Sequence, residues 1–289
     1  MPTSGRPGSS SSRGSWTRTS LSSWRGRKTS GSCATGSWPR PSGAPSCSSH
    51  PDVHRLLVHP DPQDPETFRL DPRQSRHARL SLRLRPGDVF IAFDGRGREW
   101  EAEVVCTSPV VVARLLRPRP GIVPPHRLTL YQGMPKSDKM DTIVRMGTEL
   151  GIGRFVPVLM ERSVKRGGRV DRWRRIAEEA AKQCRRADVP DVQDPLPFAD
   201  AVAEFSGHGR RLFLWEGGGR PLLVALGAPA QDPDIGVFVG PEGGFAPEEV
   251  NALTPRAEAV TLGPLVLRTE TAGIAAAAVL LAWATGREG

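Results

Sequence analysis

The chain has 289 residues, with 40 Lys or Arg against 31 Asp or Glu and a formal net charge of +9. This length suffices for two ordinary domains with sizeable cores, and the basic balance favours a polyanionic partner. The longest apolar run, near the C-terminus, is shorter than the roughly 20 residues that a membrane span needs, and no apolar core of a secretory signal is present. We therefore expect a soluble, cytoplasmic protein with no membrane partner.

Residues 1–52 are rich in Ser, Gly, Arg and Pro and show no apolar periodicity. Such a segment cannot bury enough surface to offset its ordering entropy, so we expect a disordered low-complexity tail. Its tryptophans and arginines could stack on single-stranded nucleic acid. We favour the alternative that upstream DNA is translated here from a misassigned start, with Val53 as the alternative initiator.

The cysteines argue against a metal site. Two of the four lie in the tail, and Cys106 and Cys184 are far apart, with no CxxC motif or Cys/His cluster near them. Neither a disulfide framework nor a metal centre is expected, and a reducing cytoplasm fits this usage.

Residues 53–118 are typical of a small β module. The short segments HRLLV, VFIAFD, EWEAEVV and VVVARLL alternate or run apolar, and turn residues separate them. Asp94-Gly95 predicts a hairpin, because glycine accepts the positive φ of a tight turn. The segment RPRPGIVPP, Arg117–Pro125, is too rich in proline for a sheet ladder. We expect residues 119–125 to link two domains.

Strand and helix patterns alternate over residues 126–289. The expected strands are RLTLYQG, RFVPVLM, RLFLWEG, IGVFVG and AVTLG, and the expected helices contain MDTIVRMGTELG, DRWRRIAEEAAKQCRRA, a segment opening at Ala246, and TETAGIAAAAVLLAWA. This alternation predicts an α/β domain with a largely parallel sheet covered by helices. In such sheets ligands bind beyond the carboxyl ends of the strands.

The loop GPEGG, Gly240–Gly244, follows one of these strands directly. Its glycines let the backbone approach a ligand, and Glu242 can accept hydrogen bonds from an amine or hydroxyl. No Lys-Ser/Thr pair follows, as a phosphate loop would require, and no GxGxxG motif indicates a dinucleotide site. Taken alone, the loop is equally consistent with a tight strand-to-helix turn.

A second glycine loop, TLGPLVLRTETAGIAAAA, follows the next strand and leads into an Ala-rich helix. Together with VGPEGGF, ELGIGRFVPVLMERSV and RWRRIAEEAAKQCRRADVPDV, it resembles the RsmE family of bacterial 16S ribosomal RNA uridine N3-methyltransferases, in the SPOUT superfamily. The resemblance covers residues 53 to about 284. It implies a trefoil-knotted, parallel-sheet α/β methyltransferase domain (126–289) preceded by a PUA-like RNA-binding β-barrel (53–118), acting as a homodimer on 16S rRNA of the small ribosomal subunit.

The resemblance also implies a site for S-adenosylmethionine among three loops. This cofactor has an apolar-faced adenine, ribose hydroxyls and an amino-acid end, so aliphatic groups, backbone amides and a carboxylate suit it. For any one leucine, core packing is an equal alternative. The expected cofactor-binding residues are Leu214, Glu216, Gly218, Val239, Gly240, Pro241, Glu242, Gly243, Gly244, Leu262, Gly263, Leu265, Leu267 and Arg268.

Methylation of a uracil nitrogen requires that nitrogen to lose its proton, so the enzyme must stabilise an anion. We expect Arg268 to hold negative charge on a uracil oxygen and Glu270 to orient the base or accept its proton. The alternative is that Thr269 caps the last helix and Glu270 complements its dipole. An RNA-binding module with a degenerate cofactor site is the runner-up function, and an α/β enzyme with a nucleotide cofactor is a distant third.

RNA phosphates are expected to meet basic side chains of both domains. A solvated arginine face is the alternative for the cluster in the β module. One departure from the family pattern is Arg145-Met146, where Gln-Lys is common, and it leaves the role of that helix face open. The expected RNA-binding residues are Arg76, Arg79, Arg83 and Arg85 of the β module, and Lys136, Lys139 and Arg162 further along the chain.

Overall fold

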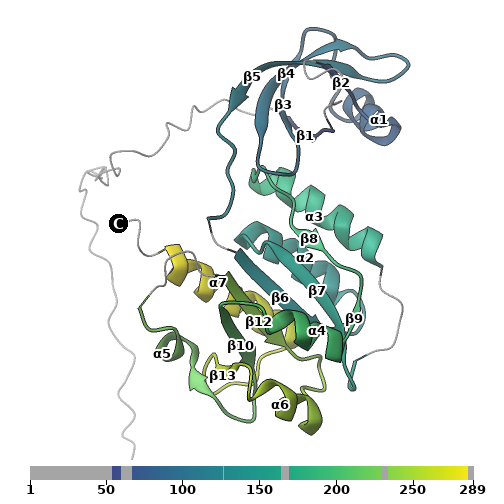
Figure 1. Ribbon diagram of the computed structural model, residues 1–289. Coiled ribbons are helices and arrows are strands. Elements are labelled where there is room, and N and C mark those ends of the chain that lie inside the picture. The colour runs from purple at the N-terminus through teal and green to yellow at the C-terminus, as the bar shows by residue number, and fades with distance from the viewer. Residues whose placement is uncertain (1–53, 60–66, 126, 164–168, 229–233, 286–289) are drawn as a thin grey trace, which may run out of the picture. The chain divides into compact units, whose positions relative to one another are not determined.

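The computed structural model describes residues 54–59, 67–125, 127–163, 169–228 and 234–285 (Figure 1). Every described element belongs to one compact unit, His50–Gly289. The predicted tail, Met1–Asp52, lies outside the described residues.

The first part of this unit is a five-stranded curled sheet with one helix. Its order is β1-β3-β4-β5-β2, in which β1 pairs with β3 in parallel and the other pairs are antiparallel. Phe68, Phe90 and Val104 are among the side chains buried in its core. The predicted β module is confirmed. Its elements are β1 (Arg55–Leu57), β2 (Thr67–Arg69), α1 (Pro72–Leu80), β3 (Val89–Phe93), β4 (Glu99–Cys106) and β5 (Val112–Arg119).

The predicted hairpin at Asp94-Gly95 is also confirmed, because it joins β3 to the antiparallel β4. Gly95 has φ +72°, which only glycine adopts readily. The Asp94 carboxylate accepts hydrogen bonds from the amides of Arg96 and Arg98, at 2.8 and 3.0 Å. Burial raises the pKa of Asp94, but these bonds and the Arg98 guanidinium outweigh it and lower the pKa below its usual value.

Two features of this sheet differ from the prediction. Helix α1 was not expected, because only Ser75 and Ala78 are buried along it and no apolar stripe marks it in the sequence. The prediction that Arg117–Pro125 is too rich in proline for a sheet ladder is wrong for its first three residues, since β5 continues to Arg119 and Pro118 lies opposite Trp100 of β4. Strand β2 pairs with β5 only as far as Arg114. On that side of β5, Pro118 has no partner strand among the described residues, so the N–H group that proline lacks is not needed there.

The second part is an eight-stranded, wholly parallel sheet, as the alternating pattern predicts. Its order is β11-β13-β10-β12-β6-β7-β8, and β9 also pairs with β7. Its strands are β6 (Arg127–Gly133), β7 (Arg154–Leu159), β8 (Asp191–Val192), β9 (Leu196–Pro197), β10 (Arg210–Leu214), β11 (Arg220–Pro221), β12 (Asp234–Val239) and β13 (Glu258–Thr261). Its helices are α2 (Lys139–Leu150), α3 (Val170–Cys184), α4 (Phe198–Phe205), α5 (Leu222–Leu226), α6 (Pro247–Leu253) and α7 (Thr269–Thr285).

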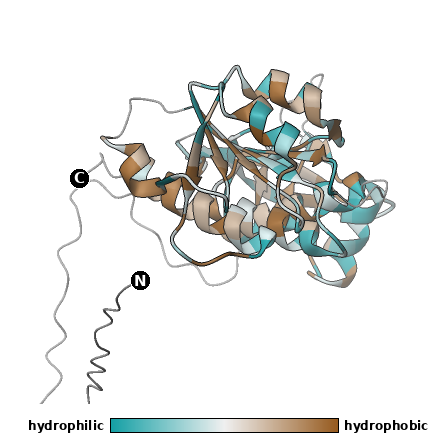
Figure 2. Cartoon of the chain, turned by 90° about the horizontal axis from the view of Figure 1, so that it is seen from below, coloured by the Kyte–Doolittle hydropathy of each residue, from teal (hydrophilic) through white to brown (hydrophobic). Residues whose placement is uncertain are grey.

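Side chains alternate along the central strands and so build two cores, one on each face of the sheet. In β12, Val237 and Val239 join the cluster that contains α2, α3, α5 and α7, whereas Phe238 joins the cluster that contains α4 and α6. Because both faces of such a parallel strand are buried, its sequence is a continuous run of apolar residues. Figure 2 colours these central strands as hydrophobic.

The end of β12 is built as the sequence predicts. Helix α6 begins at Pro247, and the Glu249 carboxylate accepts the amide hydrogen of Ala246 at 2.8 Å, which satisfies a free donor at the helix start. Its other oxygen accepts the amide of Glu161 at 2.9 Å. The loop Gly240–Gly244 is thus held between two fixed elements.

Candidate active site

Three loops meet where adjacent parallel strands end. Strands β13, β10 and β12 are neighbours in the sheet, so the loops that follow them lie at one edge. Two adjoining hollows open there. The first is lined by Leu214–Glu216, Val260–Leu267 and Ala272, and the second by Lys139, Leu214, Glu216, Val239–Glu242, Gly244, Val266–Thr269 and Ala272. Their shared lining residues make them two parts of one site.

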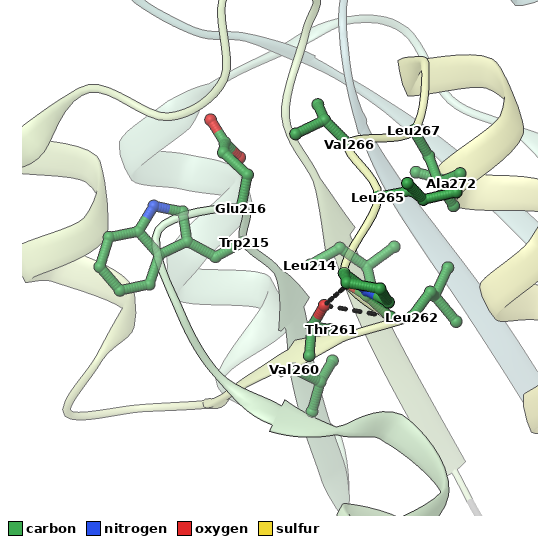
Figure 3. A pocket seen from close by; sticks show the side chains of 12 residues that line it. Leu214, Trp215, Glu216, Val260, Thr261, Leu262, Leu265, Val266, Leu267 and Ala272 are labelled. Carbon is green, nitrogen blue, oxygen red and sulfur yellow. Dashed lines mark hydrogen bonds between the residues drawn. The ribbon is translucent and has the colours of Figure 1, made fainter. Parts of the chain in front are cut away.

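The first hollow is mainly apolar (Figure 3). Leu265 and Val266 are 78 % and 84 % exposed, which is unusual for large aliphatic side chains and rules out core packing for Leu265. The Thr261 hydroxyl donates to the Gly263 carbonyl at 2.9 Å and accepts its amide hydrogen at 3.2 Å. This bond fixes the turn in which Gly263 has φ +137°. The loop therefore presents apolar groups to a ligand on a defined backbone.

The second hollow has a tightly packed backbone wall. Gly244 has φ +66°, and a Cβ added there would collide with the Glu216 carboxylate. The Thr269 hydroxyl donates to the Gly240 carbonyl at 2.6 Å and accepts from the Gln132 amide at 2.8 Å. Helix α7 begins at Thr269 itself, so the alternative that this residue caps it is wrong. Its hydroxyl instead joins β6, the GPEGG loop and α7.

Lys139 and Glu242 line the second hollow, whereas the predicted catalytic residue Glu270 adjoins Lys139 but does not belong to the lining of either hollow. The Lys139 ammonium lies 2.9 Å from one oxygen of Glu242 and 3.2 Å from one oxygen of Glu270. The hydrogen bond that Lys139 donates to Glu242 is the main reason that the pKa of Lys139 is raised. Burial raises the pKa of Glu242, but the bonds from Lys139 and from backbone amides outweigh it and lower the pKa. Lys139 and Glu242 therefore keep their charges at neutral pH.

Arg268 differs from the other charged groups at this site. It lines the second hollow, it is exposed, and among the residues that the structure describes no carboxylate lies within ion-pair distance of it. A guanidinium without an acidic partner is free to bind an anion. Arg268 is thus the side chain best placed to meet negative charge on a substrate.

The structure places most of the predicted cofactor residues together. All of them line one of the two hollows except Gly218 and Gly243. Gly218 has φ +135° with open space beside it, and Gly243 lies under Arg162, which donates to its carbonyl at 2.9 Å. The lining residues that sequence reasoning missed are Trp215, Val260, Thr261, Pro264, Val266, Thr269 and Ala272. Most of these are direct neighbours of predicted residues.

The predicted RNA-binding residues are arranged in two ways. Arg76 and Arg79 lie on α1, and Arg83 and Arg85 lie in the turn after it. All four are exposed, and within the described ranges none pairs with a carboxylate. Near the hollow, the Lys136 amide donates to Glu242 at 3.0 Å. Lys139 forms ion pairs with Glu242 and Glu270, and Arg162 donates to the Gly243 carbonyl.

The described residues contain no group of His, Cys, Asp and Glu side chains that could hold a metal ion. Within the same ranges, no helix has the length and apolar character that crossing a bilayer requires.

Comparison with known families defines the class of protein. Residues 123–281 match the RNA methyltransferase domain family, and residues 70–105 match the RNA methyltransferase PUA domain family. The α/β part with its open hollow is therefore a methyltransferase domain that acts on RNA, and the curled sheet before it is a PUA-like domain.

Individual relatives make the assignment narrower. Ribosomal RNA small subunit methyltransferase E of Mycobacterium tuberculosis (strain CDC 1551 / Oshkosh) is 36 % identical over 220 residues, which are 72 % of this chain and 83 % of the relative. The enzyme of the same name from Bacillus subtilis (strain 168) is 29 % identical over 73 % of this chain and 88 % of its own. The chain belongs to the ribosomal RNA small subunit methyltransferase E family.

Solved structures agree with this assignment. The methyltransferase E from Neisseria gonorrhoeae bound to S-adenosyl methionine has a TM-score of 0.72 and 29 % identity, covering 79 % of this chain and 97 % of its own. A Legionella pneumophila protein in complex with bound SAM has a TM-score of 0.72 and 26 % identity, covering 80 % and 97 %. The predicted family and fold class are confirmed. The trefoil knot stays a prediction, because strand order does not establish how the chain is threaded.

Proposed function

We propose that this protein transfers a methyl group from S-adenosylmethionine to N3 of a specific uridine in 16S rRNA of the small ribosomal subunit. The observation that supports this most is the open hollow at the ends of three parallel strands, in which the Arg268 guanidinium, which pairs with no described carboxylate, lies beside apolar and acidic groups. In this proposal the predicted PUA-like domain, 53–118, extends by one residue to the end of β5 at Arg119, and the methyltransferase domain spans residues 126–289. The protein acts in the cytoplasm, where ribosomal subunits are assembled.

The residues at the hollow suit S-adenosylmethionine. Leu262, Leu265 and Leu267 offer apolar contacts for adenine, the backbone around Gly240 and Gly244 offers amides and carbonyls, and Glu216 offers a carboxylate for hydroxyl or amine groups. The exposed Leu265 and Val266 are surfaces that a ligand would cover. When bound, the cofactor supplies the methyl group, and the electron pair of its breaking carbon–sulfur bond stays on sulfur.

The side chains of the protein have the remaining tasks. In this proposal the Glu270 carboxylate takes the proton from N3, whose freed electron pair then forms the new bond to carbon. Arg268 donates hydrogen bonds to a uracil oxygen on which negative charge develops. The two side chains act together, because the ring nitrogen is a good nucleophile only as its proton leaves, and the negative charge that then develops on the uracil must be stabilised.

The test is methylation of small ribosomal subunits, and of their naked rRNA, from cells that lack this gene. We expect one uridine to gain a methyl group, found at N3 by mass mapping of rRNA fragments. Calorimetry with S-adenosylmethionine, ATP and NAD should show binding of the first alone. A protein that binds RNA but neither binds nor uses S-adenosylmethionine would instead be the RNA-binding module with a degenerate site.

We predict that the arginines of the PUA-like domain hold RNA phosphates. Replacing Arg76, Arg79, Arg83 and Arg85 with Ala should weaken RNA binding uniformly across sequences, because phosphate contacts carry no sequence information. The salt dependence of log K should become shallower by about 0.7–0.9 for each phosphate that the variant no longer neutralises. Affinity measured over a range of salt concentrations checks this.

Two arginines of β5 provide the matched control for that measurement. Arg114 and Arg117 are exposed too, but they pair with Glu103 and Glu101 at 2.7 Å. Their replacement by Ala should change the salt slope little. Equal effects of the two sets would mean that only the overall charge matters, and that the cluster is a solvated face.

We also propose a homodimer. Helix α2 exposes Met146 (39 %) and Leu150 (40 %), and α5 exposes Leu223 (70 %) and Val224 (59 %), so apolar surface is available for a second copy. Sedimentation at micromolar concentration should show a dimer. A stable, active monomer would be the contrary result.

A further inference from the structure

Lys139 connects the starts of two helices with the loop after β12 at the second hollow. It is the first residue of α2, Glu242 belongs to the loop after β12, and Glu270 is the second residue of α7. Its ammonium forms ion pairs with both carboxylates, at 2.9 and 3.2 Å, and the Lys136 amide donates to the two oxygens of Glu242, at 3.0 and 3.2 Å. The side chains of the three groups are only 19–29 % exposed.

This arrangement is poorly suited to holding an RNA phosphate. Lys139 already has two carboxylates as neighbours, so the three groups together carry a charge of −1 and would repel a phosphate that approached the ammonium. Lys136 differs, because only its backbone amide is bound to Glu242 and its side chain is exposed. The two lysines of the same loop thus have different surroundings.

The bond between Lys139 and Glu270 has a direct consequence for the reaction. A carboxylate that takes a proton from N3 must be ionised and must be held within reach of the base. Glu242, which is anchored by backbone amides, fixes the ammonium, and the ammonium fixes one oxygen of Glu270. The chain of contacts Lys136 amide, Glu242, Lys139 and Glu270 therefore determines where that carboxylate lies.

We infer that Lys139 is a positioning residue that fixes the Glu270 carboxylate next to the hollow, and that it is not a phosphate contact. The inference rests on the proposed function, because it gives Glu270 the task of accepting the N3 proton. Other charged groups at the same hollow are Glu242, Glu216 and Arg268. Only Lys139 contacts Glu270 by an ion pair among the described residues.

The experiment compares Lys139→Gln, Lys139→Arg and Lys136→Gln. Lys139→Gln should lower the single-turnover methylation rate about 10- to 100-fold, part of the contribution of an acid–base group. It should also move the acid limb of the pH–rate profile to higher pH, because the carboxylate loses its nearest positive charge. Lys139→Arg should restore much of the rate and the original profile. RNA affinity and its salt slope should stay near those of the parent protein in both.

Lys136→Gln should show the opposite pattern. It should make the salt dependence of RNA binding shallower by about 0.7–0.9 if its side chain meets one phosphate, and leave the pH–rate profile unchanged. Circular dichroism checks that each variant is folded. If Lys139→Gln does not fold, the rate, the pH–rate profile and the salt slope of Lys139→Arg are compared with those of the parent protein instead.

The outcomes separate the inference from the proposed function. A parent protein that methylates no uridine would defeat the proposed function, and the salt slope, which needs no turnover, would still decide whether Lys139 contacts phosphate. If the parent is active and Lys139→Gln lowers the salt slope while its pH–rate profile is unchanged, the inference is wrong. A loss of S-adenosylmethionine affinity that accounts for the whole loss of rate would overturn it as well.

Discussion

Arg268→Ala should lower the single-turnover methylation rate about 100- to 1,000-fold, the cost of losing one donor to a developing anion. The guanidinium lines the hollow and no described carboxylate neutralises it, so its charge is available to the uracil oxygen. An interaction made mainly in the transition state affects turnover more than ground-state binding. The affinity for S-adenosylmethionine should therefore change little. Rapid-quench methylation at saturating RNA, together with calorimetry, measures both quantities.

Two further variants make this result interpretable. Arg268→Lys keeps the charge and loses the planar fork, so an intermediate rate is expected. Arg256→Ala is the matched control, because Arg256 is an exposed arginine that bonds to the Ala252 carbonyl and does not line either hollow. An unchanged rate in Arg268→Ala would remove this arginine from the mechanism.

Local sequence patterns were sufficient to predict the central strands of the parallel sheet and the edge at which the hollows open, whereas the cofactor site among three loops came from the resemblance to the RsmE family. Runs such as IGVFVG mark strands buried on both faces, and the glycine loops directly after them mark the carboxyl edge where the hollows open. The helices with a clear apolar stripe, α2 and α3, were predicted close to their observed bounds. In each case the signal depends on residues within one or two turns of each other.

Features that depend on distant residues were not predicted. Strands β8, β9 and β11 have two residues each, and they exist because a neighbouring strand offers a partner. Lys139 was expected to face RNA, and its position in the sequence gives no indication that Glu242 and Glu270, more than 100 residues away, neutralise it. The loop GPEGG was predicted as a ligand loop, yet the pair Gly243-Gly244 does not reveal which glycine meets the ligand.

Of these two glycines only Gly244 lines the second hollow, so a substitution there tests the role of the loop more directly than one at Gly243. Gly244 has the positive φ, lines the second hollow and lies against the Glu216 carboxylate, whereas Gly243 lies outside the lining and faces Arg162. A methyl group at position 244 would push Glu216 out of place and strain the backbone. Gly244→Ala should therefore lower S-adenosylmethionine affinity at least about tenfold, or about 1.4 kcal/mol. It should also lower the free energy of unfolding by about 1–3 kcal/mol.

The controls separate backbone strain from damage to the site. Gly87 has φ +91° in the PUA-like domain, and nothing lies within 4 Å of an added Cβ, so Gly87→Ala should reproduce the strain and leave cofactor affinity intact. In Gly243→Ala the new Cβ would approach the Arg162 Cβ to 3.0 Å, which a movement of the chain at Arg162 by a few tenths of an ångström would relieve, so near-normal affinity is expected. Calorimetry and urea unfolding give the two quantities for each variant. If folded Gly244→Ala binds S-adenosylmethionine as the parent does, the loop is only a turn between β12 and α6, and the cofactor must contact the hollow elsewhere.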